Sequence, residues 1–334
     1  MTGKIAVLGA GAWGIALGHM LAYSGHRVNL WARTRDAADA INERHQTPRL
    51  YDLPLHPALR ADTDAEHVLT GAEAVVSAVV SHQLRGFLRA VTKVWPRDAM
   101  VVSASKGLER GTCKRMTQIL KDELPQVPKS RLAVLSGPNL AGEMARGKPA
   151  STVVAGHYRD TARYFQKLFH SERFRVYTSE DVTGVELGGA MKNVIAIAAG
   201  MCSGLALGDN AVAAVATRGI AEIKRLGVQM GANPETFSGM AGVGDIVVTC
   251  CSQGSRNRKV GEEIGRGKPP MEAVSEKKTV AEGVHTVVAL YQLSRTLGVS
   301  LPISEIVYKV LFEDFPVSKA ARELMGRDAK EENE

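Results

Sequence analysis

The 334-residue sequence predicts an α/β protein with an N-terminal, doubly wound parallel sheet and an all-helical C-terminal domain. Two observations support this fold class. Short apolar runs alternate with helix-like stretches up to about residue 180, which is the order that a parallel sheet with covering helices requires. From about residue 181 the chain is rich in alanine and glycine, and no strand alternation returns. We therefore expect two domains, at 1–185 and 186–334.

The expected elements follow one another along the chain. Apolar runs predict strands at 4–8, 26–31, 73–80, 99–104, 132–136 and 150–155. Stretches with helical periodicity predict helices near 34–45, 82–95, 112–124 and 158–170. In the second domain, helices are expected over 182–230 and near 258–266, 283–297 and 303–313.

A glycine-rich turn directly after the first strand predicts a dinucleotide site. The run Gly9-Ala-Gly-Ala-Trp-Gly14 precedes a helix-like stretch that begins at Ile15. In such a turn the first glycine bends the chain tightly, the second admits the pyrophosphate, and the third lets helix close onto strand. The helix N-terminus then offers free N–H groups to the anion. A merely structural turn and a secretory signal peptide are the alternatives, and the interrupting glycines with a single preceding Lys4 disfavour the signal peptide.

The end of the second strand favours NADPH over NADH. A site selective for NAD usually ends this strand with an acidic residue that binds the ribose 2′-hydroxyl. Here the strand is followed by Ala32-Arg-Thr-Arg35, and the first acidic residue is Asp36. Because a guanidinium binds a 2′-phosphate through two parallel hydrogen bonds, Arg33 is the first candidate and Arg35 the second. The alternative interpretation is that both arginines belong to an ordinary solvated loop, which has the same composition.

The composition is that of an ordinary globular protein, with 45% hydrophobic and 23% charged residues. The net charge of +7 raises nucleic acid as a partner, but the basic residues are dispersed and only 5% of residues are aromatic. Anionic small molecules account for the charge equally well. The four cysteines lack metal-binding spacing and are typical of reduced thiols. We therefore expect neither a nucleic-acid partner nor a metal.

An apolar stretch at 187–207 contains one charged side chain, Lys192, with Asn193 beside it. A helix that is apolar on every face is buried or spans a membrane, and its glycines and lysine favour burial. A buried ammonium must snorkel, pair or act chemically, because burying it alone is costly. In an interdomain cleft, burial or a second cation would let such a lysine exchange a proton near neutral pH.

Other polar segments provide partners for Lys192. Lys106 follows a strand, at the carboxyl edge where open α/β sheets bind ligands. Asp245 follows a second glycine-rich turn, 239–244, which lacks the Gly-Lys-Ser/Thr ending of a phosphate-binding P-loop. The cationic loop at 254–259 has the donors to clamp a phosphate, although a solvated basic loop has the same composition.

Six ordered blocks of this chain closely resemble the bacterial NAD(P)-dependent glycerol-3-phosphate dehydrogenases, over residues 1 to about 325. The blocks are Gly9-x-Gly-x-Trp13-Gly14, Ser105-Lys-Gly-Leu108, Ser136-Gly-Pro-Asn139, Leu187-Gly-Gly-Ala-Met-Lys-Asn193, Gly242-x-Gly-Asp245 and Ser255-Arg-Asn-Arg258. The resemblance implies NAD(P)H-dependent, reversible reduction of dihydroxyacetone phosphate to sn-glycerol 3-phosphate, in supply of phospholipid synthesis. It also implies a cytoplasmic homodimer, and the glycines and lysine of the apolar stretch predict that no membrane is spanned.

The resemblance further implies roles for individual residues. The catalytic residues are Lys192, as proton donor to the ketone, Lys106 and Asp245. The substrate-binding residues are Lys106, Gly137, Asn139, Lys192, Asp245, Ser255, Arg256 and Asn257. With the glycine turn and Arg33 included, the cofactor-binding residues are Gly9, Gly11, Ala12, Trp13, Gly14, Arg33, Lys106, Ala141, Arg256, Val280 and Glu282. Many relatives carry Ser in place of Ala12 and Ser or Thr in place of Asn139, and neither difference threatens the chemistry.

These roles agree with the chemistry of ketone reduction. Hydride addition to the carbonyl carbon builds negative charge on the oxygen, which a protonated Lys192 stabilises before it transfers a proton. Asp245 would orient Lys192 and hold its charge, whereas Lys106 would oppose that charge. Two alternatives are another two-domain NADP-dependent dehydrogenase, of the 3-hydroxy acid or ketopantoate reductase type, and a non-catalytic NADPH sensor.

Overall fold

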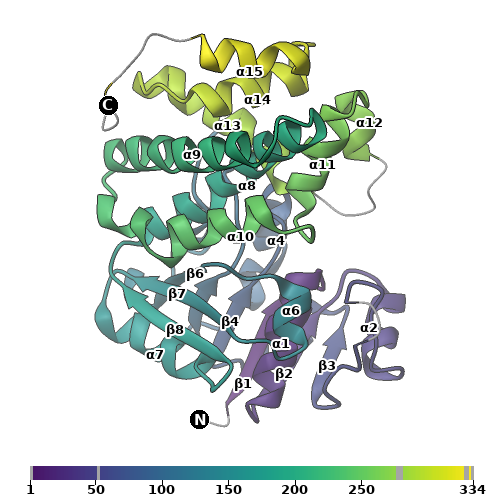
Figure 1. Cartoon of the computed structure of the whole chain (residues 1–334). Helices are drawn as coiled ribbons and strands as arrows, with labels where there is room; N and C mark the ends of the chain where they lie inside the picture. Colours follow the sequence, from purple (N-terminus) through teal and green to yellow (C-terminus); the bar gives the residue numbers. More distant parts are fainter. Residues whose placement is uncertain (1–2, 51–52, 276–280, 327–330, 332–334) are drawn as a thin grey trace.

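Within the residues that the structure describes, an eight-stranded sheet forms the N-terminal half and helices form the C-terminal half (Figure 1). The structure is a computed structural model that describes residues 3–50, 53–275, 281–326 and 331. The strands are β1 (Lys4–Leu8), β2 (Arg27–Trp31), β3 (Leu59–Asp62), β4 (Ala74–Ser77), β5 (Met100–Ser103), β6 (Leu132–Ser136), β7 (Ala150–Gly156) and β8 (Phe174–Ser179). Their order in the sheet is β3-β2-β1-β4-β5-β6-β7-β8.

The strand order changes direction between β1 and β4, as in doubly wound sheets that bind dinucleotides at this point. Strands β1 to β6 are parallel to one another. β7 runs antiparallel to β6, and β8 is parallel to β7. The predicted fold class is confirmed, but the sheet is mixed rather than wholly parallel. The chain between β6 and β7 holds only the five-residue helix α6 (Ala141–Ala145), and an antiparallel return needs no longer crossover.

The sequence patterns predicted six of these strands and missed β3 and β8. Both missed strands lie at the edges of the sheet. Their residues alternate between buried and exposed positions, and each contains an exposed arginine, Arg60 or Arg175. Because an edge strand is covered less completely than a central one, neither forms the continuous apolar run that marks a buried parallel strand.

Helices cover both faces of the sheet, each over its own apolar core. The first face is covered by α1 (Ala12–Tyr23), α2 (Arg35–Asn42), α6 and α7 (Arg159–Phe169). The second face is covered by α3 (Ala65–Leu69), α4 (Leu84–Val91) and α5 (Met116–Glu123), with short 3-10 turns η1 (Ser81–Gln83), η2 (Thr92–Val94) and η3 (Lys129–Arg131) nearby. The carboxyl ends of the parallel strands β4, β5 and β6 face the helical half, where Ser81, Lys106 and Ser136 contact Glu282 and Asp245.

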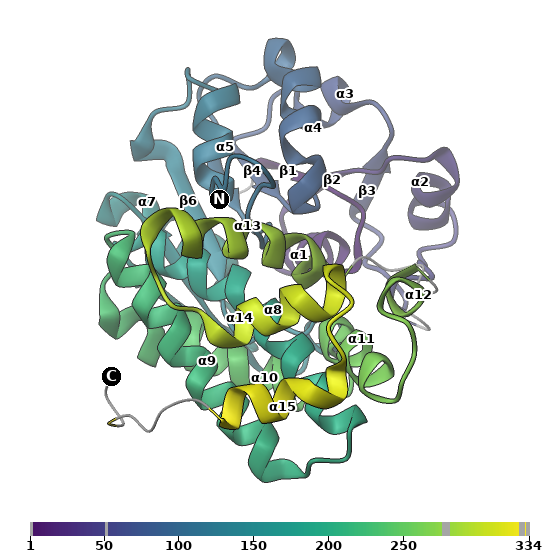
Figure 2. The same ribbon diagram turned by 90° about the horizontal axis from the view of Figure 1, so that it is seen from above.

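The helical half is built around α8 (Val182–Gly204), which is buried as predicted (Figure 2). It packs against α9 (Asp209–Gln229), α10 (Asp245–Cys251), α11 (Arg256–Gly265), α13 (Glu282–Leu297) and α14 (Pro302–Phe312). The remaining elements are η4 (Pro234–Ser238), the π-helical turn η5 (Met240–Gly244), α12 (Pro270–Ser275) and α15 (Val317–Met325). Among the described helices, α8 alone is long and apolar enough to cross a membrane, and 94% of its most apolar window is buried inside the protein.

Two details of the helical half differ from expectation. The cationic segment 254–259 is not a loop, because Ser255 is the N-cap of α11 and its Oγ accepts a hydrogen bond from the Arg258 backbone N–H. The glycine-rich turn before Asp245 is a π-helical turn that leads directly into α10. The boundary at 185/186 stays a prediction, and α8 runs unbroken across it.

Candidate active site

Two lysines bind one buried carboxylate where the two halves meet. Asp245 is fully buried, and its Oδ1 accepts a hydrogen bond from Lys192 Nζ. Its Oδ2 accepts from Lys106 Nζ at 2.6 Å. The three residues belong to α10, α8 and the loop after β5 respectively. The structure thus brings together the three residues that the sequence predicted to be catalytic, and their roles stay predictions.

Two adjacent glycines allow α8 to approach the elements that carry these partners. A Cβ atom on Gly188 would lie 2.1 Å from the Ala241 carbonyl oxygen in η5. A Cβ atom on Gly189 would lie 2.3 Å from Ser136 Oγ at the end of β6. Any side chain at these positions would push η5 and the sheet away from the helix. The pair therefore sets the spacing that lets Asp245 reach both lysines.

Two hydroxyl groups complete the cluster, and sequence reasoning missed both. Lys192 Nζ donates to Thr249 Oγ1 at 3.0 Å, and Ser136 Oγ donates to Asp245 Oδ2 at 3.5 Å. Thr249 follows Asp245 by one helical turn, so a helical interpretation of 245–251 would have placed both on one face. An ammonium has three N–H donors. Within the described residues Lys192 uses two of them, which leaves one for a substrate oxygen.

The electrostatics of the cluster favour proton exchange. The pKa of Lys106 is lowered to about 8. Burial is the main cause and the Lys192 charge adds to it, whereas the Asp245 charge raises the pKa and offsets part of both effects. Lys106 Nζ also donates to the Gly137 carbonyl oxygen at 3.2 Å. With both lysines protonated the cluster carries one net positive charge, which suits an anionic substrate and a developing oxyanion.

The glycine turn has the geometry predicted for a dinucleotide site. Gly9 has a φ of +113°, which a residue with a side chain rarely adopts. A Cβ atom on Gly14 would lie 1.9 Å from the Gly9 carbonyl oxygen, so the third glycine allows α1 to close onto β1. Gly11 is exposed, and a Cβ atom there would meet no described atom within 4 Å. The second glycine and the N-terminus of α1 therefore face open space, as pyrophosphate binding requires.

Several of the other predicted cofactor residues lie in or near this turn. Ala12, Trp13 and Ala141 are partly buried, and α6 packs against α1. Trp13 Nε1 donates to the Ala104 carbonyl oxygen at 3.0 Å, which links the turn to the strand end before Lys106. Arg33 is exposed just beyond β2. Val280 lies outside the described residues.

Glu282 and Arg256 lie near each other, at the starts of α13 and α11. Glu282 begins α13, and its carboxylate accepts a hydrogen bond from Ser81 Oγ, which follows β4. Burial raises the pKa of Glu282. Arg256, the first residue of α11, lies close enough to Glu282 for their charges to interact.

Three predicted substrate-binding residues form hydrogen bonds to other groups of the protein. Asn139 donates to the Ser151 carbonyl oxygen and accepts from Thr152 Oγ1, each at 2.9 Å, which fixes it to β7. Ser255 caps α11. Asn257 Nδ2 donates to Asn193 Oδ1 at 2.9 Å, and its Oδ1 accepts from the Gly283 N–H at 3.0 Å. The Asn257 amide therefore ties α11 to the residue beside Lys192 and to the start of α13.

Two family models match most of the chain. The model for the N-terminus of NAD-dependent glycerol-3-phosphate dehydrogenase matches residues 4–162, and the model for its C-terminus matches residues 181–322. The chain belongs to the NAD-dependent glycerol-3-phosphate dehydrogenase family. Membership confirms the predicted family and makes the protein an NAD(P)-dependent oxidoreductase.

Individual members of this family match the chain over nearly their full length. The chain is 44% identical over 331 residues to glycerol-3-phosphate dehydrogenase (NAD(P)+) of Chlorobium luteolum, covering 99% of each chain. It is 45% identical over 327 residues to the Myxococcus xanthus protein of the same name, covering 98% of each. A solved glycerol-3-phosphate dehydrogenase of Coxiella burnetii matches with a TM-score of 0.93 and 34% identity, covering 97% of this chain and 99% of that one. A ketopantoate reductase of Ralstonia eutropha, at 19% identity, a TM-score of 0.60 and coverage of 95% and 99%, shares the fold.

Proposed function

We propose that this protein reduces dihydroxyacetone phosphate to sn-glycerol 3-phosphate with NAD(P)H, and runs the reverse reaction with NAD(P)+. The proposal rests on one observation, the buried cluster in which Lys106 and Lys192 bind Asp245. Membership in the glycerol-3-phosphate dehydrogenase family supports the choice of substrate. A non-catalytic NADPH sensor has no need of two lysines held on one buried carboxylate.

In this proposal Lys192 is the proton donor. The nicotinamide, when bound, supplies the hydride that adds to the carbonyl carbon. Lys192 Nζ stabilises the charge that builds on the carbonyl oxygen and then transfers a proton to it, so the carbonyl becomes a neutral hydroxyl group. Asp245 holds Lys192 in place through an ion pair. Solvent then returns a proton to Lys192.

We assign the substrate phosphate to the start of α11, together with Lys106. Arg256 offers a guanidinium there, and the helix N-terminus adds N–H donors and its dipole. Ser255 and Asn257 shape this end through their own hydrogen bonds. Binding the phosphate away from the carbonyl positions the ketone, so this contact raises kcat as well as affinity.

We assign the pyrophosphate of the cofactor to the turn Gly9–Gly14 and the ribose 2′-phosphate of NADPH to Arg33. NADPH is then the preferred cofactor and NADH the weaker one. The predicted residues Ala12, Trp13, Ala141, Val280 and Glu282 complete that site. We further propose that the protein is a cytoplasmic homodimer that supplies phospholipid synthesis and binds no nucleic acid.

The proposed function is tested by following oxidation of NADPH and of NADH by the purified protein with dihydroxyacetone phosphate. We expect rapid oxidation with this substrate and a higher kcat/KM with NADPH. Ketopantoate and a panel of 3-oxo acids serve as competing substrates, and we expect little turnover of either. Turnover of one of those acids alone, or binding of NADPH without turnover of any substrate, would contradict the proposal.

A further inference from the structure

Lys106 lies at the base of a folded segment that joins the two halves. We call residues 105–115 the clip. Leu108 pairs with Arg115 in an isolated antiparallel bridge. The Glu109 N–H donates to the Lys114 carbonyl oxygen at 3.0 Å, and the Cys113 N–H donates to the Glu109 carbonyl oxygen at 2.9 Å. The clip is therefore an internally bonded unit, and a shift of Glu109 moves the segment that begins with Lys106.

The clip is bound to the helical half through α13. Leu108 and Cys113 are buried in the core of that half. Arg110 donates to the Val284 carbonyl oxygen at 3.4 Å, and Gln292 donates to the Gly111 carbonyl oxygen at 3.1 Å. These contacts hold the clip against the helical half, but none of them connects Glu109 to the nucleotide-binding half.

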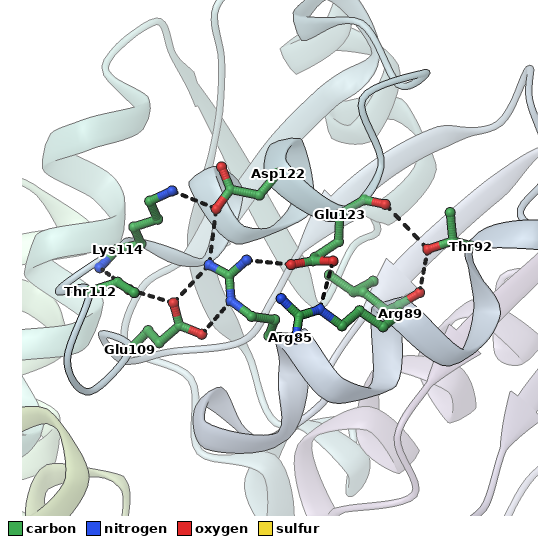
Figure 3. A network of polar contacts seen from close by, with 9 residues as sticks. Arg85, Arg89, Thr92, Glu109, Thr112, Lys114, Asp122 and Glu123 are labelled. Atoms are coloured by element: carbon green, nitrogen blue, oxygen red, sulfur yellow. Dashed lines mark hydrogen bonds and ion pairs between the residues drawn. The ribbon is translucent and has the colours of Figure 1, made fainter.

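Arg85 supplies that restraint (Figure 3). It belongs to α4, and its Nε and one terminal nitrogen donate to the two carboxylate oxygens of Glu109 at 2.7 and 2.8 Å. The same guanidinium binds Asp122 at 2.9 Å and also Glu123, both at the end of α5. Arg85 and Glu109 side chains are only 19% and 16% exposed. A planar guanidinium with two parallel bonds fixes direction as well as distance.

Two further residues of the clip, Thr112 and Lys114, form hydrogen bonds in this network. Thr112 Oγ1 donates to the Glu109 carboxylate, and Lys114 Nζ donates to Asp122 Oδ2 at 2.6 Å. Hydrogen bonds from Arg85 lower the pKa of Glu109, so this carboxylate is charged at neutral pH. The network therefore holds the clip from α4 and α5, while α13 holds it from the other side.

We propose that Arg85 is a positioning residue for Lys106, which holds Glu109 and thereby keeps the Lys106 ammonium on Asp245. Glu109 stands three residues after Lys106, and Lys106 Nζ must stay 2.6 Å from Asp245 Oδ2 to share its charge. Arg85 acts through the clip and not on the reacting atoms. The inference rests on the proposed function, because Lys106 is the residue that Arg85 serves.

The test compares Arg85→Met with Arg89→Met. Arg89 lies one turn further along α4, its side chain is 66% exposed, and it binds Glu123 at 3.1 Å. Since an error of about 1 Å in a positioned group costs about 100-fold, we expect Arg85→Met to lower kcat by roughly 10- to 100-fold. NADPH affinity should change little. Arg89→Met should leave kcat within about twofold of the wild-type protein, because exposed pairs contribute little.

Two further variants separate positioning from folding. Glu109→Gln keeps the size of the side chain and removes its charge, so it should lower kcat as Arg85→Met does. If Arg85→Met does not fold, Glu109→Gln provides the test of the positioning role. The double variant should lose no more than the worse single one, because both changes break the same contact. Arg85→Lys, which keeps the charge but not the two parallel bonds, should recover part of kcat.

A readout without turnover keeps this inference separate from the proposed function. The rate at which acetic anhydride modifies Lys106, followed against pH by peptide mass spectrometry, reports its protonation. We expect the midpoint to lie near pH 8 in the wild-type protein and to rise in Arg85→Met, because a displaced clip exposes Lys106 to water. An unchanged midpoint, or an equal loss of kcat in Arg89→Met, would overturn the positioning role. Failure of the wild-type protein to turn over dihydroxyacetone phosphate would instead refute the proposed function.

Discussion

At the scale of single residues, Asp245 organises the site. A fully buried carboxylate is costly unless it is paired, and here Lys106 and Lys192 each bind one of its oxygens. Buried ion pairs are poor stabilisers, because the cost of desolvation offsets most of the attraction. Two cations on one anion leave a net positive charge. This arrangement is better explained by binding and protonating an anionic substrate than by stabilising the fold.

The lowered pKa of Lys106 predicts how activity depends on pH. A lysine with a pKa of about 8, rather than 10.5, loses its charge as the pH rises through 8. Because we propose that protonated Lys106 binds the anionic substrate, we expect kcat/KM for dihydroxyacetone phosphate to fall over that range. In Lys106→Arg, whose guanidinium stays charged, kcat/KM should be lower but flat above pH 8. A wild-type profile that stays level to pH 10 would show that Lys106 does not carry this charge.

At the scale of elements, α8 determines how close the two halves come. Glycine inside a helix costs roughly 0.5–1 kcal/mol relative to alanine, yet α8 contains Gly188 and Gly189 next to each other. The cost is offset because the absence of side chains at these two positions lets η5 and the end of β6 pack directly against the backbone of α8. Lys192 follows one turn later on the same helix. The helix that makes the close contact thus also carries Lys192, the proposed proton donor.

This account predicts opposite effects for two glycine-to-alanine changes. Gly188→Ala would place Cβ 2.1 Å from the Ala241 carbonyl oxygen, and such overpacking typically costs about 1–3 kcal/mol. Gly86 in α4 is exposed with no described atom within 4 Å of an added Cβ, so Gly86→Ala should be neutral or stabilise by up to ~1 kcal/mol. Thermal unfolding and kcat measure both changes. A Gly188→Ala protein with wild-type Tm and kcat would refute the close-approach argument.

At the scale of the whole molecule, sequence patterns predicted the buried elements better than the edges. Central strands and α8 are apolar throughout, so their patterns were plain. Strands β3 and β8 carry exposed arginines at the sheet edges and were missed. The start of α11 was taken for a loop, because Arg256 to Lys259 are polar and its apolar positions begin only at Val260.

The site was predictable only in part, for a related reason. Lys192 is conspicuous as one charge in an apolar stretch, and the glycine turn has a local signature. Thr249 could have been found from a helical interpretation of 245–251, whereas Ser136 joins the cluster through a contact between distant segments, which no local pattern encodes. The pairing of Arg85 with Glu109 is of the same kind, since the two residues are brought together by α4 and the clip.

The central claim, that Lys192 protonates the ketone, is tested most directly by Lys192→Met. Methionine keeps the unbranched side chain up to the ε position and cannot donate a proton, and Asp245 remains paired with Lys106. Kinetics with dihydroxyacetone phosphate are compared with NADPH binding measured by fluorescence titration. We expect kcat to fall by at least about 10³-fold, because the variant loses both the general acid and the cation that stabilises the oxyanion. The Kd for NADPH should stay within about threefold of the wild-type value, because Lys192 is not assigned to the cofactor site. Near-normal turnover in this variant would contradict the claim.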